Sequence, residues 1–142
     1  MAAVRRHELG RGSKARVAVL GGGGGTAIGT AAMRGLPIGF PKLMVSTLVS
    51  GNVAPYVGTK DITMMPSIVD VAGLNRVSRT IFRNAAGAIC GMVQQKPEQS
   101  ENDRPIIVAS MFGNTTTCVN DARHQLEEAG NEVLVFHATG SG

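Results

Sequence analysis

The sequence predicts an α/β fold with a parallel, Rossmann-like, three-layer sheet. Three observations lead to this prediction: short apolar runs alternate with helical patterns, loops rich in glycine, serine and threonine follow the apolar runs, and one polar segment divides the chain. The length of 142 residues and the hydrophobic content of 43% fit a globular protein of about one domain. The same composition argues against fibrous and membrane-spanning classes.

The first part of the chain is expected to form a strand, a glycine loop, a helix and a second strand. Residues 15–20 are apolar apart from Arg16 and typical of a buried strand, and five consecutive glycines at 21–25 follow them. The pattern at 27–35 predicts a short helix that stops near Gly35. A second apolar run at 41–46 predicts another buried strand.

The longest helix is expected after a long loop. Residues 53–66 contain proline, glycine and one short apolar run, so we predict a loop with one short strand. From residue 67 to 92 the apolar residues recur at helical spacing, and Ser67 with Asp70 resembles a capping box at the start of this helix. Another face of the same helix carries three arginines, which we interpret as a solvated stripe: Arg76, Arg79 and Arg83.

A polar segment broken by proline separates a second α/β unit from the first. In the second unit, strands predicted at 105–110 and 132–136 flank an amphipathic helix at 119–129. The predicted organisation is therefore a basic flexible tail at 1–14, a unit with the glycine loop at 15–94, a linker at 95–104 and a second unit at 105–142.

Charge and cysteine content narrow the function classes. Five basic residues and one acidic residue in the first 16 positions account for the whole formal net charge of +4, and four Phe, one Tyr and no Trp provide no aromatic platform. Nucleic acid is therefore an unlikely partner by this reasoning. Cys90 and Cys118 stand apart, which favours neither zinc nor a disulfide framework. Because the chain start lacks an apolar h-region, we expect a cytoplasmic protein without a membrane partner.

The glycine loop is the first candidate binding site. Consecutive glycines free their backbone amides for an anion, and a following helix adds the positive end of its dipole, so the loop suits phosphate. No lysine follows Gly25, which excludes a Walker A loop. The spacing of Gly22, Gly24 and Ala27 satisfies a relaxed dinucleotide fingerprint, but residues 46–52 lack the acidic residue expected at the end of the second strand.

Loops at the ends of other predicted strands carry hydroxyls and small residues. Open α/β sheets bind ligands at the carboxyl ends of their strands, so these loops and the glycine loop are expected to line one crevice. Ordinary helix capping is the alternative role of each loop taken alone. The candidate cofactor-binding residues are Gly21, Gly22, Gly23, Gly24, Gly25, Thr26, Ser50, Gly51, Thr115, Thr116, Thr139 and Gly140.

A catalytic candidate is less well supported. His137 follows the last predicted strand and could act as an acid or a base, but no carboxylate lies beside it in sequence. Asp61 and Asp70 could hold a metal or serve as caps, and their spacing selects no metal. We therefore expect no metal site, and the catalytic residue stays unknown with His137 as the candidate.

Long motifs resemble a known family. The stretches PKLMVST, DITMM and DVAGLNR, together with the glycine run and the VLVFHATGSG ending, are similar to the Tm-one-like ATP-binding domain family, from about Val17 to Gly142. The family pattern GGSGGT corresponds to residues 21–26, with Gly23 in the serine position, and FHATGTGG corresponds to residues 136–142, with Ser141 for threonine. Relatives carry further segments on both sides, so the chain resembles a truncated member.

The resemblance implies two adjacent Rossmann-like subdomains. Residues 15–94 would be the C-terminal part of the first subdomain, and residues 105–142 the start of the second. It also implies ATP, with or without magnesium, as the cofactor on residues 21–26, in a module whose reaction is undefined. The alternatives are an enzyme that acts on a phosphorylated or carboxylated small molecule through His137, and an inactive or obligately associated fragment. The glycines at 87 and 91 would then pack on a partner protein or in a homo-oligomer.

Overall fold

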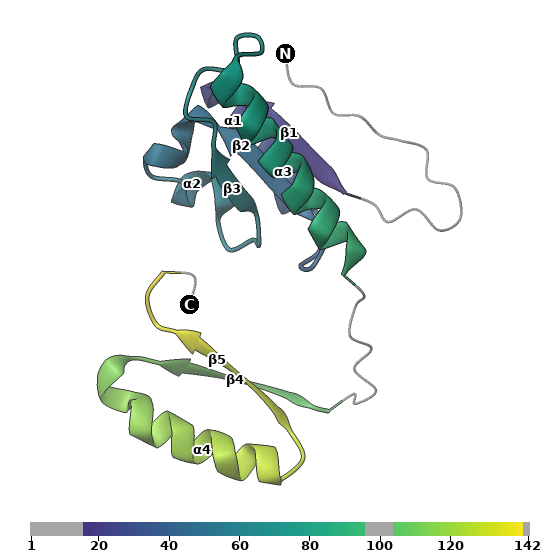
Figure 1. Ribbon diagram of the computed structural model, residues 1–142. Coiled ribbons are helices and arrows are strands. Elements are labelled where there is room, and N and C mark those ends of the chain that lie inside the picture. The colour runs from purple at the N-terminus through teal and green to yellow at the C-terminus, as the bar shows by residue number, and fades with distance from the viewer. Residues whose placement is uncertain (1–15, 96–103, 141–142) are drawn as a thin grey trace. The chain divides into compact units, whose positions relative to one another are not determined.

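The computed structural model describes residues 16–95 and 104–140, so the predicted tail and nearly all of the predicted linker lie outside the described residues. The chain divides into two compact units, Met1–Lys96 and Pro97–Gly142. Each unit contains a parallel sheet with helices, which confirms the predicted α/β class (Figure 1).

The first unit is built on a three-stranded parallel sheet in the order β1-β2-β3. The strands are β1 (Val17–Gly21), β2 (Lys42–Ser46) and β3 (Thr63–Pro66). All five residues of the central strand β2 are buried. Gly21 pairs with Ser46, and Ser46 pairs with Pro66, so the three strands end on one line across the sheet.

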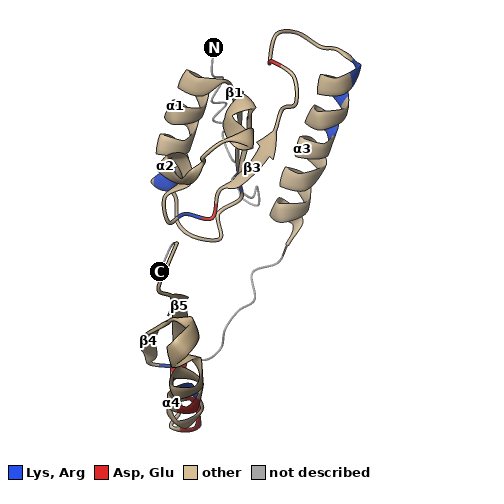
Figure 2. Cartoon of the chain, turned by 90° about the vertical axis from the view of Figure 1, so that its left-hand side faces the viewer, with Lys and Arg blue, Asp and Glu red and all other residues tan. Residues whose placement is uncertain are grey.

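Helices cover both faces of this sheet. Figure 2 shows α1 (Gly23–Arg34) on one side and α3 (Arg76–Gln94) on the other. The core under α1 consists of Val19, Met33, Met44 and Ile62. The core under α3 consists of Leu43, Val45, Ala85 and Ile89. The predicted three-layer arrangement is therefore present in the first unit, because β2 sends alternate side chains into two separate cores.

The connection from β2 to β3 contains η1 (Thr47–Ser50) and a short helix, α2 (Ala54–Val57). The short strand predicted within residues 53–66 is confirmed as β3, whereas α2 was not expected. Four residues are too few to show a helical period, so the sequence pattern does not reveal α2. In the structure, Arg34 at the end of α1 holds α2 in place. The Arg34 guanidinium donates hydrogen bonds to the carbonyl oxygens of Pro55 (3.2 Å) and Tyr56 (2.7 Å).

The predicted start of the longest helix is wrong, because α3 begins at Arg76 and not at residue 67. Asn75 is the N-cap, and its side chain accepts hydrogen bonds from the N–H groups of Val77 and Ser78, both at 2.9 Å. The Ser78 hydroxyl accepts from the Asn75 N–H at 2.9 Å and completes a capping box. With this box the helix starts directly after Asn75, and the hydroxyl of Ser67 bonds within its own loop instead. The three predicted exposed arginines do lie on the exposed side of α3.

An ion pair between a buried lysine and an exposed aspartate joins the opposite, amino-terminal end of β2 to the loop before β3. Lys42 is fully buried, and its Nζ lies 2.6 Å from Oδ1 of Asp61 and 2.7 Å from the carbonyl oxygen of Pro37. The other Asp61 carboxylate oxygen accepts the Gly39 N–H at 2.8 Å. Partial burial raises the pKa of Asp61, but the bonds from Lys42 and Gly39 and the Lys42 charge outweigh it, so the pKa lies below its ordinary value.

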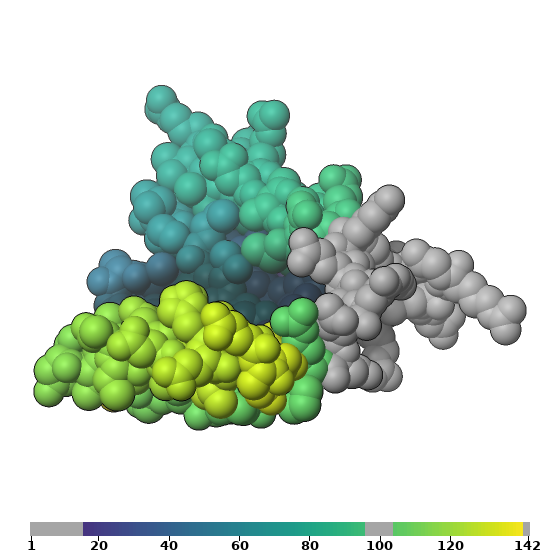
Figure 3. Space-filling model, turned by 90° about the horizontal axis from the view of Figure 1, so that it is seen from below, coloured from purple at the N-terminus to yellow at the C-terminus, as the bar shows by residue number. Residues whose placement is uncertain are grey.

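The second unit is a β-α-β motif. Its parallel strands β4 (Ile106–Met111) and β5 (Glu132–His137) are joined by η2 (Gly113–Thr115) and α4 (Thr116–Glu128). The inward positions of both strands are half-buried, and the alternate positions are exposed. The exposed positions are largely apolar: Ile106, Val108, Leu134 and Phe136. Figure 3 shows the second unit with the surface of α4 in light green.

Among the helices that the structure describes, none combines the length and the apolar character that crossing a membrane requires.

Candidate functional site

The helix α1 begins inside the glycine run, which differs from the predicted loop over residues 21–25. Gly21 ends β1, Gly22 is the N-cap, and residues 23–25 form the first helical turn. We call residues 22–25 the glycine turn. The turn has no side-chain cap, and within residues 16–95 and 104–140 no acceptor pairs with the N–H groups of residues 23–25. These amides, which we call the cradle, lie at the positive end of a 12-residue helix, an arrangement whose chemistry suits an anion.

Packing explains some of the glycines but not those of the cradle. A Cβ at Gly21 would lie 3.0 Å from the Cα of Gly25, so this position requires glycine for the turn to close. A Cβ at Gly29 would lie 2.8 Å from Cγ1 of Val19, so glycine there lets α1 pack closely on the sheet. At Gly23 and Gly24 an added Cβ would meet nothing within 4 Å. A side chain at either position would enter open space, so packing does not require glycine there.

Thr26 holds the glycine turn against the sheet. Its side chain is fully buried, and its hydroxyl lies 2.8 Å from the carbonyl oxygen of Gly22 and 2.6 Å from the hydroxyl of Ser46. Its N–H donates to the same Gly22 carbonyl at 2.8 Å. Thr26 therefore supports the cradle from inside, and the groups that face outward are the amides before it.

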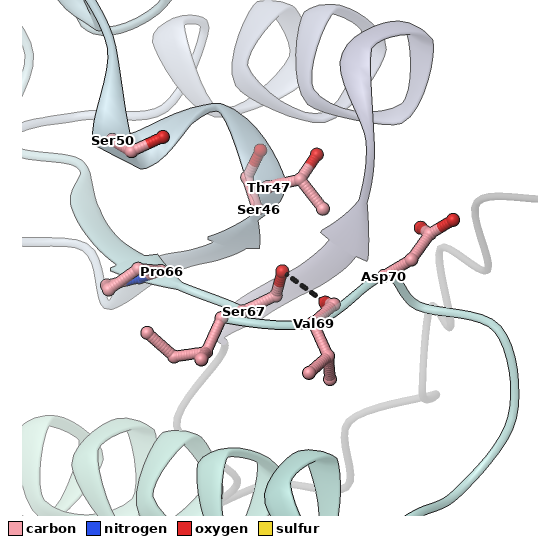
Figure 4. A pocket seen from close by; sticks show the side chains of 8 residues that line it. Ser46, Thr47, Ser50, Pro66, Ser67, Val69 and Asp70 are labelled. Atoms are coloured by element: carbon pink, nitrogen blue, oxygen red, sulfur yellow. Dashed lines mark hydrogen bonds between the residues drawn. The ribbon is translucent and has the colours of Figure 1, made fainter.

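A cavity of about 250 Å³ opens beside the glycine turn, at the carboxyl ends of β2 and β3 (Figure 4). We call it the strand-end pocket. The strand order explains its place, since Ser46 and Pro66 end neighbouring parallel strands in register. A Cβ built at Gly22 would lie 3.6 Å from Oγ1 of Thr47, so the turn and the pocket adjoin. The residues that line it are Ser46, Thr47, Ser50, Pro66, Ser67, Ile68, Val69 and Asp70.

The structure brings together part of the predicted site. Residues 21–26 lie at the same sheet edge as Ser50, which lines the strand-end pocket. Gly51 follows at the end of η1, where its N–H bonds the carbonyl oxygen of Leu48 at 3.0 Å. The sequence thus locates the glycine turn and one wall of the pocket.

The other predicted binding residues belong to the second sheet. The Thr115 hydroxyl bonds the carbonyl oxygen of Phe112 at 2.9 Å, and the Thr116 hydroxyl bonds that of Gly113 at 3.1 Å. Thr139 and Gly140 follow β5, and Gly140 has a φ of +81°. The hydroxyls of Thr115 and Thr116 thus bond within their own turn, and one crevice shared by both units stays a prediction.

His137, the catalytic candidate, ends β5 and is exposed. Its ring stacks on that of Phe112, with centroids 6.0 Å apart and an angle of 24° between the planes. In the part of the chain that the structure describes, no carboxylate bonds to this imidazole. The imidazole of His137 is therefore stacked on Phe112, and among the described residues no carboxylate is hydrogen-bonded to it, as one would be in a typical catalytic acid or base pair.

Sequence reasoning missed the far wall of the pocket, residues 67–70, because it placed Ser67 and Asp70 at a helix start. The signal available was their position directly after the third strand, where ligand sites of parallel sheets lie. Asp61 and Asp70 do not share a function, since Asp61 pairs with Lys42. Over the described ranges, no group of three or more His, Cys, Asp or Glu residues is placed to hold a metal, and Cys90 and Cys118 are free and exposed.

Comparison with known proteins agrees with the resemblance in the motifs. Residues 2–98 match the N-terminal domain of the uncharacterised protein family UPF0261, and residues 104–142 match its C-terminal domain. A UPF0261 protein of Clostridium tetani is 56% identical over 123 residues, which cover 87% of this chain and 30% of that protein. A UPF0261 protein of Rhizobium meliloti is 56% identical over 128 residues, 90% of this chain and 32% of that protein.

A plant relative links the chain to the Tm-one-like group. The ToMV resistance protein Tm-1(GCR237) of Solanum lycopersicum is 45% identical over 128 residues, which cover 87% of this chain and 17% of that protein. The chain thus spans less than a third of the length of each of these relatives. The matches to both domains and to these relatives show that the chain belongs to the UPF0261 family.

Proposed function

We propose that the first unit is a nucleotide-binding module that holds phosphate groups on the glycine turn, with ATP as the nucleotide that the family resemblance favours. The observation that carries this proposal is the uncapped first turn of α1. Its three glycine amides have no acceptor within the described residues, and they lie at the carboxyl edge of a parallel sheet. Such amides and the helix dipole together favour an anion.

The surroundings of the turn support phosphate over a bare carboxylate ligand. Thr26 and Ser46 fix the turn to β2 through buried hydroxyls, so the cradle is rigid before a ligand arrives. Thr47 adds an exposed hydroxyl beside Gly22. A phosphate offers several acceptor oxygens to these donors at once, which a single-point anion does not. No reaction is included in the proposal, and the activity of the longer relatives is not inferred from it.

The test is a denaturation experiment on the full 142-residue chain with and without magnesium ATP. A ligand at about 100 times its dissociation constant adds roughly 2.7 kcal/mol to the free energy of unfolding, which is readily measured. We expect a rise of this size for the wild-type chain. An unfolding free energy that ATP, ADP and GTP leave unchanged overturns the proposal.

Gly24→Asp is the informative variant. Its side chain enters open space, and a carboxylate in the first turn stabilises a helix by about 0.3–1 kcal/mol, so the fold is kept. The same carboxylate repels phosphate and competes for the amides, so the ATP effect disappears. Gly24→Asn has nearly the same shape without the charge and retains most of the effect. Equal ATP responses of the two variants would place the phosphates elsewhere.

A further inference from the structure

The strand-end pocket differs chemically from the glycine turn beside it. Cavities that enclose a drug-sized ligand have volumes of roughly 300–1,000 Å³. At about 250 Å³ the pocket fits one ring-sized group and not a whole nucleotide. Its lining residues include no lysine or arginine, and Asp70 is the one charged residue among them. A phosphate group in this pocket would meet a carboxylate and no cation, so its occupant is an uncharged part of the ligand.

The hydroxyls of the pocket fall into two groups. The hydroxyls of Ser46 and Ser67 are buried and bond to other groups of the protein. The Ser46 hydroxyl lies 2.6 Å from that of Thr26 and accepts the Leu48 N–H at 3.0 Å. The Ser67 hydroxyl donates to the Val69 carbonyl oxygen at 2.7 Å. The groups left for a ligand come from the remaining polar lining residues, which are all exposed: Thr47, Ser50 and Asp70.

Asp70 is the acceptor of this set. Its Oδ1 accepts the Val71 N–H at 2.7 Å, and across residues 16–95 and 104–140 no donor bonds its Oδ2. A carboxylate oxygen without a donor at the rim of a small polar cavity recognises groups that donate, and vicinal hydroxyls of a sugar are such groups. In dinucleotide-binding folds, the acidic residue that bonds the sugar follows the second strand. In this chain Asp70 follows β3 instead.

The backbone before Asp70 adopts a costly conformation to reach the pocket. Ile68 has a φ of +65°, the only positive φ of a non-glycine residue in the described ranges. The Val69 N–H donates to the Ser67 carbonyl oxygen at 2.7 Å, which closes a tight γ-turn around Ile68. A β-branched residue rarely adopts such a φ, and strain of this kind gathers at ligand sites. Figure 4 shows the chain running from Pro66 past Ser67 and Val69 to Asp70 along one side of the pocket.

We propose that the strand-end pocket takes the sugar of the bound nucleotide, with Asp70 accepting its hydroxyls, so that the chain selects ribonucleotides. This inference rests on the proposed nucleotide site at the glycine turn. The two sites adjoin at Gly22 and Thr47, which lets one ligand place its phosphates on the amides and its sugar in the pocket.

The experiment measures the affinities of the full chain for ATP, 2′,3′-dideoxy-ATP and inorganic triphosphate, in wild type and in Asp70→Asn. We expect the wild type to bind ATP about tenfold or more tightly than the dideoxy compound, the usual effect of hydrogen bonds to a charged acceptor. In Asp70→Asn the two nucleotides bind equally, and the affinity for triphosphate is unchanged. Asp121→Asn, which removes an exposed carboxylate of α4, is the matched control and keeps the full difference.

The outcomes separate this inference from the proposed function. If no probe binds the wild type, both are overturned. If ATP and the dideoxy compound bind the wild type equally, only the sugar assignment is overturned. If Asp70→Asn weakens all three probes to the same extent, Asp70 acts on the phosphates or on magnesium, and the sugar assignment is again overturned.

Discussion

Removal of the Asp61 carboxylate by Asp61→Asn should destabilise the first unit substantially. Lys42 is fully buried in the central strand, and its ammonium depends on Oδ1 of Asp61 at 2.6 Å and on the Pro37 carbonyl oxygen at 2.7 Å. With asparagine at this position, the buried ammonium keeps only neutral acceptors, the Pro37 carbonyl oxygen and the asparagine amide oxygen, and no negative charge. Leaving such a charge uncompensated is among the few single changes with a large effect on stability.

The expected magnitude follows from the burial of the two partners. Breaking a buried ion pair by removing one partner costs about 3–5 kcal/mol. The Asp61 side chain is 39% exposed, so solvent screens part of the interaction, and we expect a loss of about 2–3 kcal/mol. That is a large fraction of the roughly 5–15 kcal/mol that stabilises an ordinary domain.

Urea denaturation of four chains measures the interaction: wild type, Asp61→Asn, Lys42→Met and the double variant. Methionine has nearly the length of lysine and carries no charge, so Asp61→Asn should cost much less in the Lys42→Met background. The lost Pro37 bond occurs in both arms of the cycle and cancels. A coupling energy below about 0.5 kcal/mol would refute the view that Asp61 neutralises a buried Lys42.

The pH dependence provides a second readout of the same pair. Burial raises the pKa of Asp61, but the hydrogen bonds from Lys42 and Gly39 lower it by more. The pKa of Asp61 in the folded state therefore lies below its value in the unfolded state. The stabilisation is therefore complete above the unfolded pKa and is lost as the pH falls through the folded pKa. The free energy of unfolding of the wild type should fall with acid over this range, and that of Asp61→Asn should fall less.

Three further predictions concern stability, each checked by urea denaturation. Gly29→Ala should lower the unfolding free energy by about 1–2 kcal/mol, because the added Cβ would lie 2.8 Å from Cγ1 of Val19. Gly87→Ala adds its Cβ in open space and should raise the unfolding free energy by about 0.5–1 kcal/mol. Equal effects of the two substitutions would contradict this reasoning. Thr26→Val should cost about 1–2 kcal/mol by breaking the 2.6 Å bond to β2, and Thr26→Ser less. Ile68→Gly should not destabilise, because relief of about 1–3 kcal/mol of strain offsets the freedom of glycine; a loss above about 1 kcal/mol would contradict it.

Local patterns were sufficient to locate most elements of the fold. The apolar runs at 41–46 and 132–136 became β2 and β5 almost residue for residue, because a strand buried on both faces, or packed on a helix, needs apolar side chains. Gly35 ended α1 as expected. The predicted helix face of α3 was also correct over its second half, where Ala85 and Ile89 are buried.

The errors fall where two local signals compete. Ser67 with Asp70 and Asn75 with Ser78 both have capping spacing, and sequence alone does not rank them. The packing of β3 against β2 extends the chain to Pro66, and the γ-turn at Ile68 then prevents a helix from starting there. The glycine run predicts a loop for a similar reason, since glycine is a poor helix former in isolation. Thr26, bonded to both Gly22 and Ser46, allows the helix to begin among the glycines.

The sequence by itself determined the α/β class, the order of strands and helices, the family and the position of the glycine turn, because periodicity, composition and motifs are local properties of the chain. Only the tertiary structure decided which groups meet. Parallel pairing aligned Gly21, Ser46 and Pro66 at one edge, gave Lys42 its partner Asp61 and brought Asp70 to the strand-end pocket. These contacts join residues distant in sequence, so they depend on register and on the positive φ of Ile68, neither of which a local pattern specifies.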